Sequence, residues 1–325
     1  MTAGKVLVLG TGGTVASVAT PNGLEPVGGL RAGISIDGPQ VEVEEVFSLS
    51  SAAIGFAEIA QVYRRIDRAH GEGFAGVIVA HGTDTLAETA FVITLLHRDS
   101  SLPVVLTGAM RAPDQAGSDA ARNLADAVAV IRSGVDFGSR VVVVFDGRVL
   151  PGLTAQKVSS TSMAAFDAPN GGQLAEVIEE RVQLQARTSH QVSRLVLDPE
   201  SVGTVSLIGA MPADDGTALR ACADRVDGVV IAGLGGGHVA PQMMDTLGQV
   251  ARNKPVLVTT GTAAGGALTS TYAGPGSEQS LAAAGAITGW SLGPRKAALA
   301  LSLCLGQTTD LEQLRTSMNE NMKGL

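Results

Sequence analysis

Two short segments place hydroxyl and carboxyl side chains next to glycine, and each follows a run of apolar residues. The first holds Gly13 and Thr14 in the stretch TGGT, and the second holds Gly82, Thr83 and Asp84 in HGTDT. Glycine lets a backbone approach a bound ligand closely. Hydroxyls, a carboxylate and the free N–H groups of a helix start can grip a small zwitterion and stabilise an oxyanion. Together the segments indicate a site for a small charged substrate.

Phosphate binding and helix capping would each require only part of these segments. A glycine-rich turn can cradle phosphate, but the dinucleotide pattern G-x-G-x-x-G fails at Val15, and no Lys-Ser or Lys-Thr pair follows to make a P-loop. A threonine or aspartate at a helix start also acts as a cap, worth about 1 kcal/mol. Capping explains one polar residue of HGTDT but not the whole run.

The surrounding sequence predicts an α/β domain that positions both segments. Short β-branched or apolar runs alternate with stretches that carry apolar residues at helical spacing, a pattern typical of a mainly parallel sheet with helical crossovers. Ligands of such sheets bind beyond the C-terminal ends of the strands, where both segments lie. The predicted strands are residues 5–9, 41–47, 76–80, 103–107 and 140–145, and the predicted helices are residues 57–70, 85–97 and 119–133.

A second, smaller α/β domain is predicted beyond a polar, irregular stretch that contains Pro199. We assign residues 1–182 to the larger N-terminal domain, residues 183–203 to a linker and residues 204–325 to the C-terminal domain. In this last domain the predicted strands are residues 205–208, 228–232 and 255–259, and the predicted helices are residues 217–224, 241–253, 294–305 and 310–322.

Composition limits the class of protein and of partner. The 325 residues are 45% hydrophobic and 17% charged, which suffices for one or two cores. A net charge of -8 disfavours nucleic acid and anionic membranes as partners. No apolar stretch approaches the ~20 residues of a membrane helix, and residues 6–9 are too few for a signal-peptide core. With only Cys222 and Cys304, a disulfide framework is excluded and a cytoplasmic location is expected.

The two segments resemble the signature motifs of the bacterial-type L-asparaginase family, TGGT at residues 11–14 and HGTDTLAETA at residues 81–90. The resemblance implies hydrolysis of L-asparagine to L-aspartate and ammonia through a threonine nucleophile and an acyl-enzyme, without cofactor or metal. It also implies homodimers or homotetramers with sites near subunit interfaces. The similarity continues through LTGAMRAP (106–113), GLTAQK (152–157), SSTSMAAF (159–166), GLGGGHV (233–239) and GPRKA (293–297), so it covers nearly the entire chain.

The resemblance also assigns roles to individual residues. Thr14 stands at the position of the nucleophile, and Thr83, Asp84 and Lys157 match a second catalytic group near the scissile amide. A threonine hydroxyl needs a neighbour that takes its proton, and a lysine beside Thr83 can exchange protons with it. The serines of FSLSSA resemble a pair that binds the substrate's α-carboxylate, and one backbone carbonyl is expected to face the amide nitrogen. The implied substrate-binding residues are Ser50, Ser51, Gly13, Gly82 and Ala109.

One departure concerns the activation of Thr14. Family members commonly carry a tyrosine in the mobile loop after the first motif, whereas SVATPNGLEPV at residues 17–27 has none. Glu25 and Glu278 are alternatives for this partner. Tyr272 lies near the region from which the family draws an acidic residue across the subunit interface. The sequence alone does not identify the residue that activates Thr14.

Two further patterns favour structural roles. The run GWSLG at residues 289–293 matches the nucleophile elbow of α/β-hydrolases, but that fold needs a histidine after the serine, and all five histidines precede Ser291. A helix start with Pro294 in its first turn explains the run better. The histidines and cysteines lack zinc-binding spacing, and His238 is a candidate both for a substrate contact and for a structural hydrogen bond.

Two classes of function remain, an amide hydrolase and a binding protein that kept an amino-acid pocket without turnover. Retention of Thr14, Thr83, Asp84 and Lys157 favours the hydrolase. The asparaginase-like subunit of tRNA-dependent amidotransferases shares these motifs, but usually with an extra N-terminal domain that these 325 residues do not show. Preference for asparagine over glutamine stays open, because one methylene changes binding by only ~1–3 kcal/mol.

Overall fold

The computed structural model describes residues 4–21, 23–26, 30, 40–97, 101–188, 198–308 and 310–322. The chain divides into two compact units, Met1–Ser189 (unit 1) and His190–Leu325 (unit 2). This division falls inside the expected linker at residues 183–203, of which residues 189–197 lie outside the described part. The domain boundaries themselves stay a prediction.

Unit 1 is built on an eight-stranded sheet with the order β12-β11-β8-β7-β6-β5-β1-β4. Its parallel strands are β4 (Val41–Leu49), β1 (Val6–Gly12), β5 (Gly76–Ala80), β6 (Val104–Thr107) and β7 (Val141–Phe145). The chain places β4 on one side of β1 and the later parallel strands on the other. The connections after β1 and β5 therefore diverge, which creates the topological switch point where open α/β sheets bind ligands.

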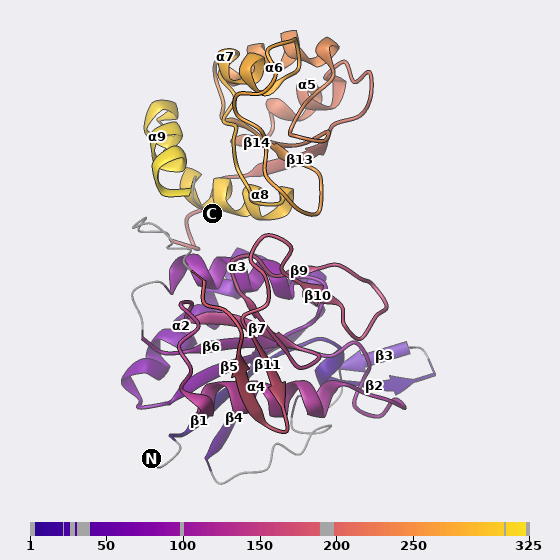
Figure 1. Cartoon of the computed structure of the whole chain (residues 1–325), viewed down its shortest axis with the longest axis vertical. Helices are drawn as coiled ribbons and strands as arrows, with labels where there is room; N and C mark the ends of the chain where they lie inside the picture. Colours follow the sequence, from indigo (N-terminus) through magenta and orange to yellow (C-terminus); the bar gives the residue numbers. More distant parts are fainter. Residues whose placement is uncertain are drawn as a thin grey trace. The chain divides into compact units, whose positions relative to one another are not determined.

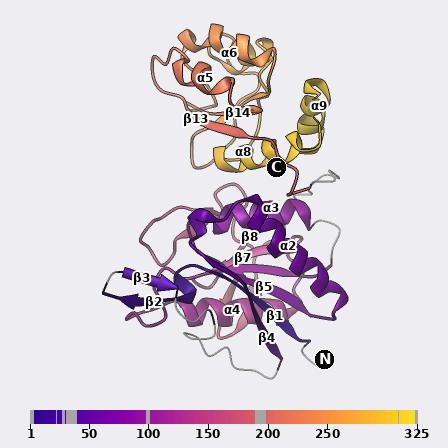
Figure 2. The ribbon, with the colours of Figure 1, turned by 180° about the vertical axis from the view of Figure 1, so that it is seen from behind.

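Helices cover both faces of this sheet, as Figures 1 and 2 show. Helices α2 (Phe56–Gly71) and α3 (Leu86–Leu96) pack on one face, and α4 (Ala120–Ser133) packs on the other. Strands β1, β5, β6 and β7 are buried along their whole lengths. Their nearly unbroken apolar runs follow from this, because a parallel strand covered on both faces has no polar side. The predicted mainly parallel α/β domain is confirmed.

An antiparallel extension of the sheet was not predicted. It consists of β8 (Arg148–Pro151), β11 (Ala175–Ile178) and β12 (Arg181–Leu184). Asp146 and Gly147 join β7 to β8 with φ of 50° and 75°, and Glu179 and Glu180 join β11 to β12 with φ of 50° and 60°. Two residues of positive φ match the twist of a tight hairpin. Because β12 ends at Leu184, regular structure reaches into the stretch that we expected to be linker.

Short elements complete unit 1. The expected mobile loop at residues 17–27 contains a hairpin of β2 (Ser17–Thr20) and β3 (Gly23–Pro26), while Asn22 and Val27 lie outside the described residues. A second two-stranded ribbon joins β9 (Gln156–Lys157) to β10 (Phe166–Asp167). The 3-10 helices η1 (Thr14–Ala16) and η2 (Ser51–Ala53) follow β1 and β4.

Unit 2 is the predicted smaller α/β domain, with a parallel sheet of order β13-β14-β15. One face of the sheet packs against α5, α6 and α7 around Leu219, Leu247 and Leu281, and the other face packs against α8 (Figure 1). The helix predicted at residues 241–253 begins as a 3-10 turn, and α7 was not predicted. The elements are β13 (Val205–Gly209), α5 (Thr217–Ala223), β14 (Gly228–Gly233), η3 (Pro241–Met243), α6 (Met244–Ala251), β15 (Val256–Thr260), α7 (Glu278–Ala283), α8 (Pro294–Leu305) and α9 (Leu311–Met322).

The run GWSLG leads into α8, whose first turn holds Pro294, as expected for a helix start. Among the helices that the structure describes, none is both long and apolar enough to cross a membrane.

Packing against the sheet predicts different outcomes for two glycines of unit 1. A Cβ on Gly76 would lie 2.5 Å from Cδ1 of Ile131, whereas a Cβ on Gly71, the last residue of α2, would meet nothing within 4 Å. We expect Gly76→Ala to destabilise the fold by about 1–3 kcal/mol through overpacking. Gly71→Ala should be neutral or stabilise it by up to ~1 kcal/mol through helix propensity. Thermal unfolding of both variants checks this, and equal melting temperatures would contradict the described packing.

Candidate active site

The ends of β1 and β5 touch through two glycines. Gly13 has φ 78°, and a Cβ built on it would lie 2.3 Å from Cα of Gly82. A side chain at residue 13 would therefore clash with the backbone and adopt a strained conformation. Thr14 follows one of these glycines, and Thr83 follows the other. The two predicted segments thus form adjacent corners at the switch point of the sheet.

The structure brings Lys157 to the second corner. Its Nζ donates to Oγ1 of Thr83 at 2.9 Å and to Oδ1 of Asp84 at 2.7 Å. Thr83 is buried, and only 17% of the Lys157 side chain is exposed, whereas the Asp84 side chain is 68% exposed. An ammonium with little access to water is stabilised by such close acceptors. The predicted group of Thr83, Asp84 and Lys157 is therefore connected by hydrogen bonds.

Lys157 belongs to the two-stranded ribbon of β9 and β10, in which it pairs with Phe166. Arg148 fixes this ribbon, because its guanidinium donates to the carbonyl of Phe166 at 3.0 Å and to Oδ1 of Asp167 at 2.7 Å. The pKa of Asp167 is lowered by the N–H of Ala168 and by the Arg148 guanidinium. The ring of Phe166 also packs on that of Phe145, with 4.8 Å between centroids. The position of Lys157 is thus set by contacts outside the site.

Ser51 connects the end of a third strand, β4, to the corner after β5. It is buried, its carbonyl accepts from Oγ1 of Thr85 at 2.7 Å, and its Oγ accepts from N of Asp84 at 3.3 Å. A Cβ on Gly82 would lie 2.7 Å from this Oγ. Ser50, by contrast, is exposed and precedes η2. Of the two predicted serines, Ser51 contacts the corner directly.

The end of β6 contributes a fourth corner. A Cβ on Gly108 would lie 2.3 Å from the carbonyl oxygen of His81, so the backbones after β5 and β6 are in contact. Ala109 follows Gly108 and is fully buried. The predicted backbone carbonyl therefore lies on the turn that adjoins His81.

His81 was not predicted to have a role beyond its place in HGTDT. It is fully buried, with Nδ1 2.8 Å from the carbonyl of Gly82 and Nε2 3.1 Å from Oγ1 of Thr89. A carbonyl only accepts, so Nδ1 carries the proton and the Thr89 hydroxyl donates to Nε2. Burial lowers the pKa of His81 to about 4, against the hydrogen bond to Gly82, which raises it. His81 is thus a neutral support for the corner.

Thr14 begins η1 and is partly buried. Within the described residues, no hydrogen bond engages its hydroxyl. The Glu25 side chain lies outside the described part of the structure. Glu278 lies in unit 2, where it is buried, contacts Nε2 of His238 at 3.0 Å and accepts from N of Tyr272 at 2.5 Å. The second unit therefore gathers three residues that the sequence left without an assigned role.

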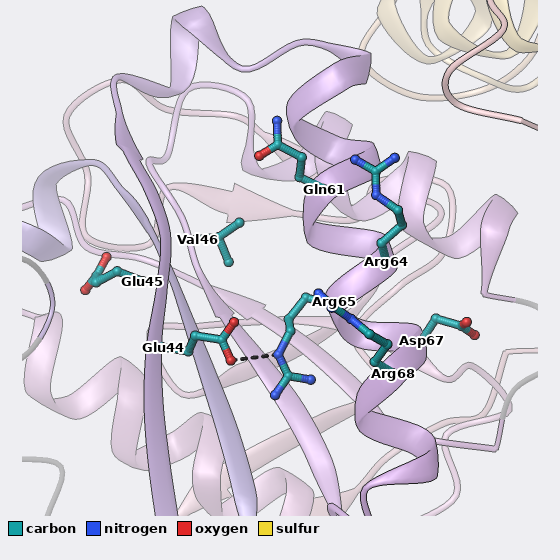
Figure 3. Close-up of a pocket in the computed structure, with 8 residues that line it drawn as sticks. All are labelled: Glu44, Glu45, Val46, Gln61, Arg64, Arg65, Asp67 and Arg68. Atoms are coloured by element: carbon teal, nitrogen blue, oxygen red, sulfur yellow. Dashed lines mark hydrogen bonds and ion pairs between the residues drawn. The ribbon is translucent and has the colours of Figure 1, made fainter.

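A cavity of about 510 Å³ lies elsewhere, between β4 and α2 (Figure 3). None of the predicted site residues lines it. In Figure 3 the Arg65 guanidinium points at Glu44, with Nε 2.7 Å from Oε2, and Arg65 also pairs with Glu72 at 3.0 Å. These ion pairs cover an edge strand with charge, a common protection against edge-to-edge pairing. No cluster of three or more metal-ligating side chains occurs in the ranges that the structure describes.

Comparison with known proteins identifies the family of this chain. The family model "Asparaginase, N-terminal" matches residues 5–190, and "Glutaminase/Asparaginase C-terminal domain" matches residues 204–318. The chain belongs to the asparaginase family. It is 33% identical to an L-asparaginase of Bacillus licheniformis over 319 residues, covering 93% of this chain and 95% of the relative.

Two further relatives bear on the function of this family member. The solved structure of the thermostable L-asparaginase from Thermococcus kodakarensis superimposes with a TM-score of 0.88 at 31% identity, covering 98% of each chain. A glutamyl-tRNA(Gln) amidotransferase subunit of Aeropyrum pernix is 30% identical over 342 residues, covering 98% of this chain but 79% of that protein. Both the fold and the two-part organisation are thus shared with proteins that carry the asparaginase name, and the sequence similarity extends to this amidotransferase subunit.

The burial of His81 predicts a pH dependence of stability. The unfolded chain binds a proton on this imidazole below about pH 6.5, whereas the folded chain does so only below about pH 4. Stability from this group is therefore complete above pH 6.5 and is lost as the pH falls to 4, by on the order of 3 kcal/mol. Urea unfolding from pH 7 to pH 4.5 should show a smaller fall in stability for His81→Gln than for the unmodified chain. Parallel falls would show that His81 titrates normally.

Proposed function

We propose that this chain is an L-asparaginase that hydrolyses the side-chain amide of L-asparagine, with Thr14 as the nucleophile. The observation that carries the proposal is the contact of the Gly13 and Gly82 corners, with Lys157 bonded to Thr83 at 2.9 Å beside them. A hydroxyl nucleophile and a partly buried lysine next to a second hydroxyl are groups that suit acyl transfer from an amide.

The reaction has two stages. The Thr14 hydroxyl attacks the carboxamide carbon, and the resulting oxyanion is met by backbone N–H groups of the glycine-containing corners. The carbon–nitrogen bond then breaks, the departing nitrogen takes up the proton that the Thr14 hydroxyl lost and leaves as ammonia, and an ester of aspartate on Thr14 remains. Water attacks this ester and releases aspartate. Thr83, Asp84 and Lys157 lie within hydrogen-bond distance of one another, which lets a proton pass among them.

Substrate contacts follow from the same corners. We assign the α-carboxylate to Ser50 and Ser51, of which the buried Ser51 is the better placed, since it adjoins Gly82 and Asp84. The Ala109 carbonyl is assigned to the amide nitrogen. We assign Gly13 and Gly82 to the substrate site because, without side chains, they let the strand ends that would hold the substrate approach one another closely. No cofactor or metal takes part in this scheme.

The assembly and setting of the enzyme are part of the proposal. Homodimers or homotetramers, a cytoplasmic location and a division into residues 1–182, 183–203 and 204–325 follow from the family resemblance and the composition. An ammonia-generating amidotransferase subunit is the second candidate, favoured by the similarity to the Aeropyrum pernix protein. A homologue that binds the amino acid without turnover is the third. Ammonia release from free asparagine by the purified chain separates the first two candidates from the third, and a search for a partner subunit separates the asparaginase from the amidotransferase subunit.

Two substitutions test the catalytic roles. Thr14→Ala removes the nucleophile and Lys157→Ala removes the group bonded to Thr83, so each should lower ammonia release from asparagine at least ~100-fold. Thr217→Ala and Lys5→Ala are matched controls, because both residues are exposed, Thr217 lies in unit 2, and Lys5 precedes β1 at the strand end opposite to the Gly13 corner. Circular dichroism verifies that each variant is folded. Near-normal activity of both folded site variants would refute the assigned roles.

A further inference from the structure

The turn after β6 is hydrogen-bonded to the side chain of Asp119, the residue that precedes α4. Its carboxylate accepts from N of Met110 at 3.0 Å on both oxygens, and from N of Arg111 at 3.0 Å. A residue at this place usually bonds the free N–H groups of its own helix. Asp119 makes no such side-chain bond to α4. Its carboxylate serves the turn rather than the helix.

Asn123, one helical turn later, adds further hydrogen bonds to the same turn and to Asp119. It is fully buried, and its Nδ2 donates to the carbonyl of Gly108 at 3.0 Å and to Oδ2 of Asp119 at 3.0 Å. Its Oδ1 accepts from N of Asp146 at 3.0 Å. The ends of β6 and β7 are thereby fastened to the start of α4, and the Asp119 carboxylate is held in one orientation.

The bond to Met110 has a direct consequence for Ala109. The carbonyl of residue 109 and the N–H of residue 110 belong to one planar peptide unit, in which they point in opposite directions. When Asp119 fixes the N–H of Met110, it also fixes the Ala109 carbonyl so that it points away from Asp119. No donor within the described residues bonds this carbonyl. The orientation of this carbonyl is therefore set through the bond that Asp119 makes to Met110.

We propose that Asp119 is a positioning residue that aims the Ala109 carbonyl at the leaving nitrogen of the substrate, and thereby favours amides over esters. The proposal rests on the function proposed above. An amide nitrogen carries hydrogens that bond to this carbonyl, and the ester oxygen of an aspartate β-methyl ester carries none. An anion that accepts from Met110 N–H also polarises the peptide unit and strengthens its carbonyl as an acceptor. Asp119 acts through Ala109 and does not touch the substrate.

The test compares asparagine with L-aspartate β-methyl ester, with aspartate formation as the readout. Asp119→Asn keeps the size of the side chain but turns one acceptor into a donor, which faces the N–H groups of Met110 and Asn123. We expect the ratio of kcat/KM for asparagine to kcat/KM for the ester to fall about tenfold, the effect of losing one directed hydrogen bond. Turnover of the ester should change by less than about twofold.

Two further variants keep the test decisive. Asp119→Ser retains a residue that suits a helix start while it removes the carboxylate, and it should reproduce the fall if Asp119→Asn does not fold. Ser133→Ala disturbs the opposite end of the same helix, where Ser133 bonds to Val130 and Val135, and it should leave the ratio unchanged. An equal loss on both substrates, or no loss on either, would overturn the role of Asp119. If the unmodified chain releases no ammonia from asparagine, the proposed function fails instead.

Discussion

The contact between Gly13 and Gly82 is the constraint on which the rest of unit 1 depends. With 2.3 Å from a hypothetical Cβ to the opposite Cα, no other residue fits at position 13 without separating the two corners. The contact lies at the switch point of the sheet, where the connections after β1 and β5 diverge. The order of the parallel strands makes the two connections diverge. The two turns nevertheless stay in contact at their starts, because glycine stands in each of them. Thr14 and Thr83 each follow directly after one of the two glycines that are in contact.

Around this contact, the ionisable side chains are either uncharged or partly exposed to solvent. His81 lies directly under the second corner, and its low pKa leaves it uncharged, so it supports Gly82 without adding a cation beside Lys157. Lys157 bonds to one buried neutral acceptor and to one carboxylate that is largely in water. A fully buried ion pair would carry a large desolvation cost. The observed arrangement avoids this cost and leaves the ammonium bonded to Thr83 and Asp84.

Much of unit 1 was predictable because buried parallel strands have a strong sequence signal. The runs of valine, leucine and isoleucine located β5 without error and β6 and β7 within one residue. The antiparallel extension was missed because its strands are short and partly polar, although the Asp146-Gly147 pair is a recognised hairpin signal. The resemblance to the asparaginase family placed Thr83, Asp84 and Lys157 in one group, and the structure joins them by hydrogen bonds. The sequence did not reveal His81 or Asp119 as supports of the corners, because each acts there through bonds to backbone groups, which sequence motifs do not show.

This reliance on backbone explains how the architecture is kept at modest sequence identity. The structure from Thermococcus kodakarensis shares 31% of residues with this chain, yet superimposes over 98% of it. At the corners, the groups in contact are mainly peptide atoms, glycine Cα atoms and carbonyls, which most sequences can supply. Side chains contribute at these corners where they orient a peptide plane, as Asp119 does for Met110, or where they donate to a hydroxyl, as Lys157 does to Thr83. The geometry of the corners in this chain thus depends on a few polar side chains placed around a sheet of buried apolar residues.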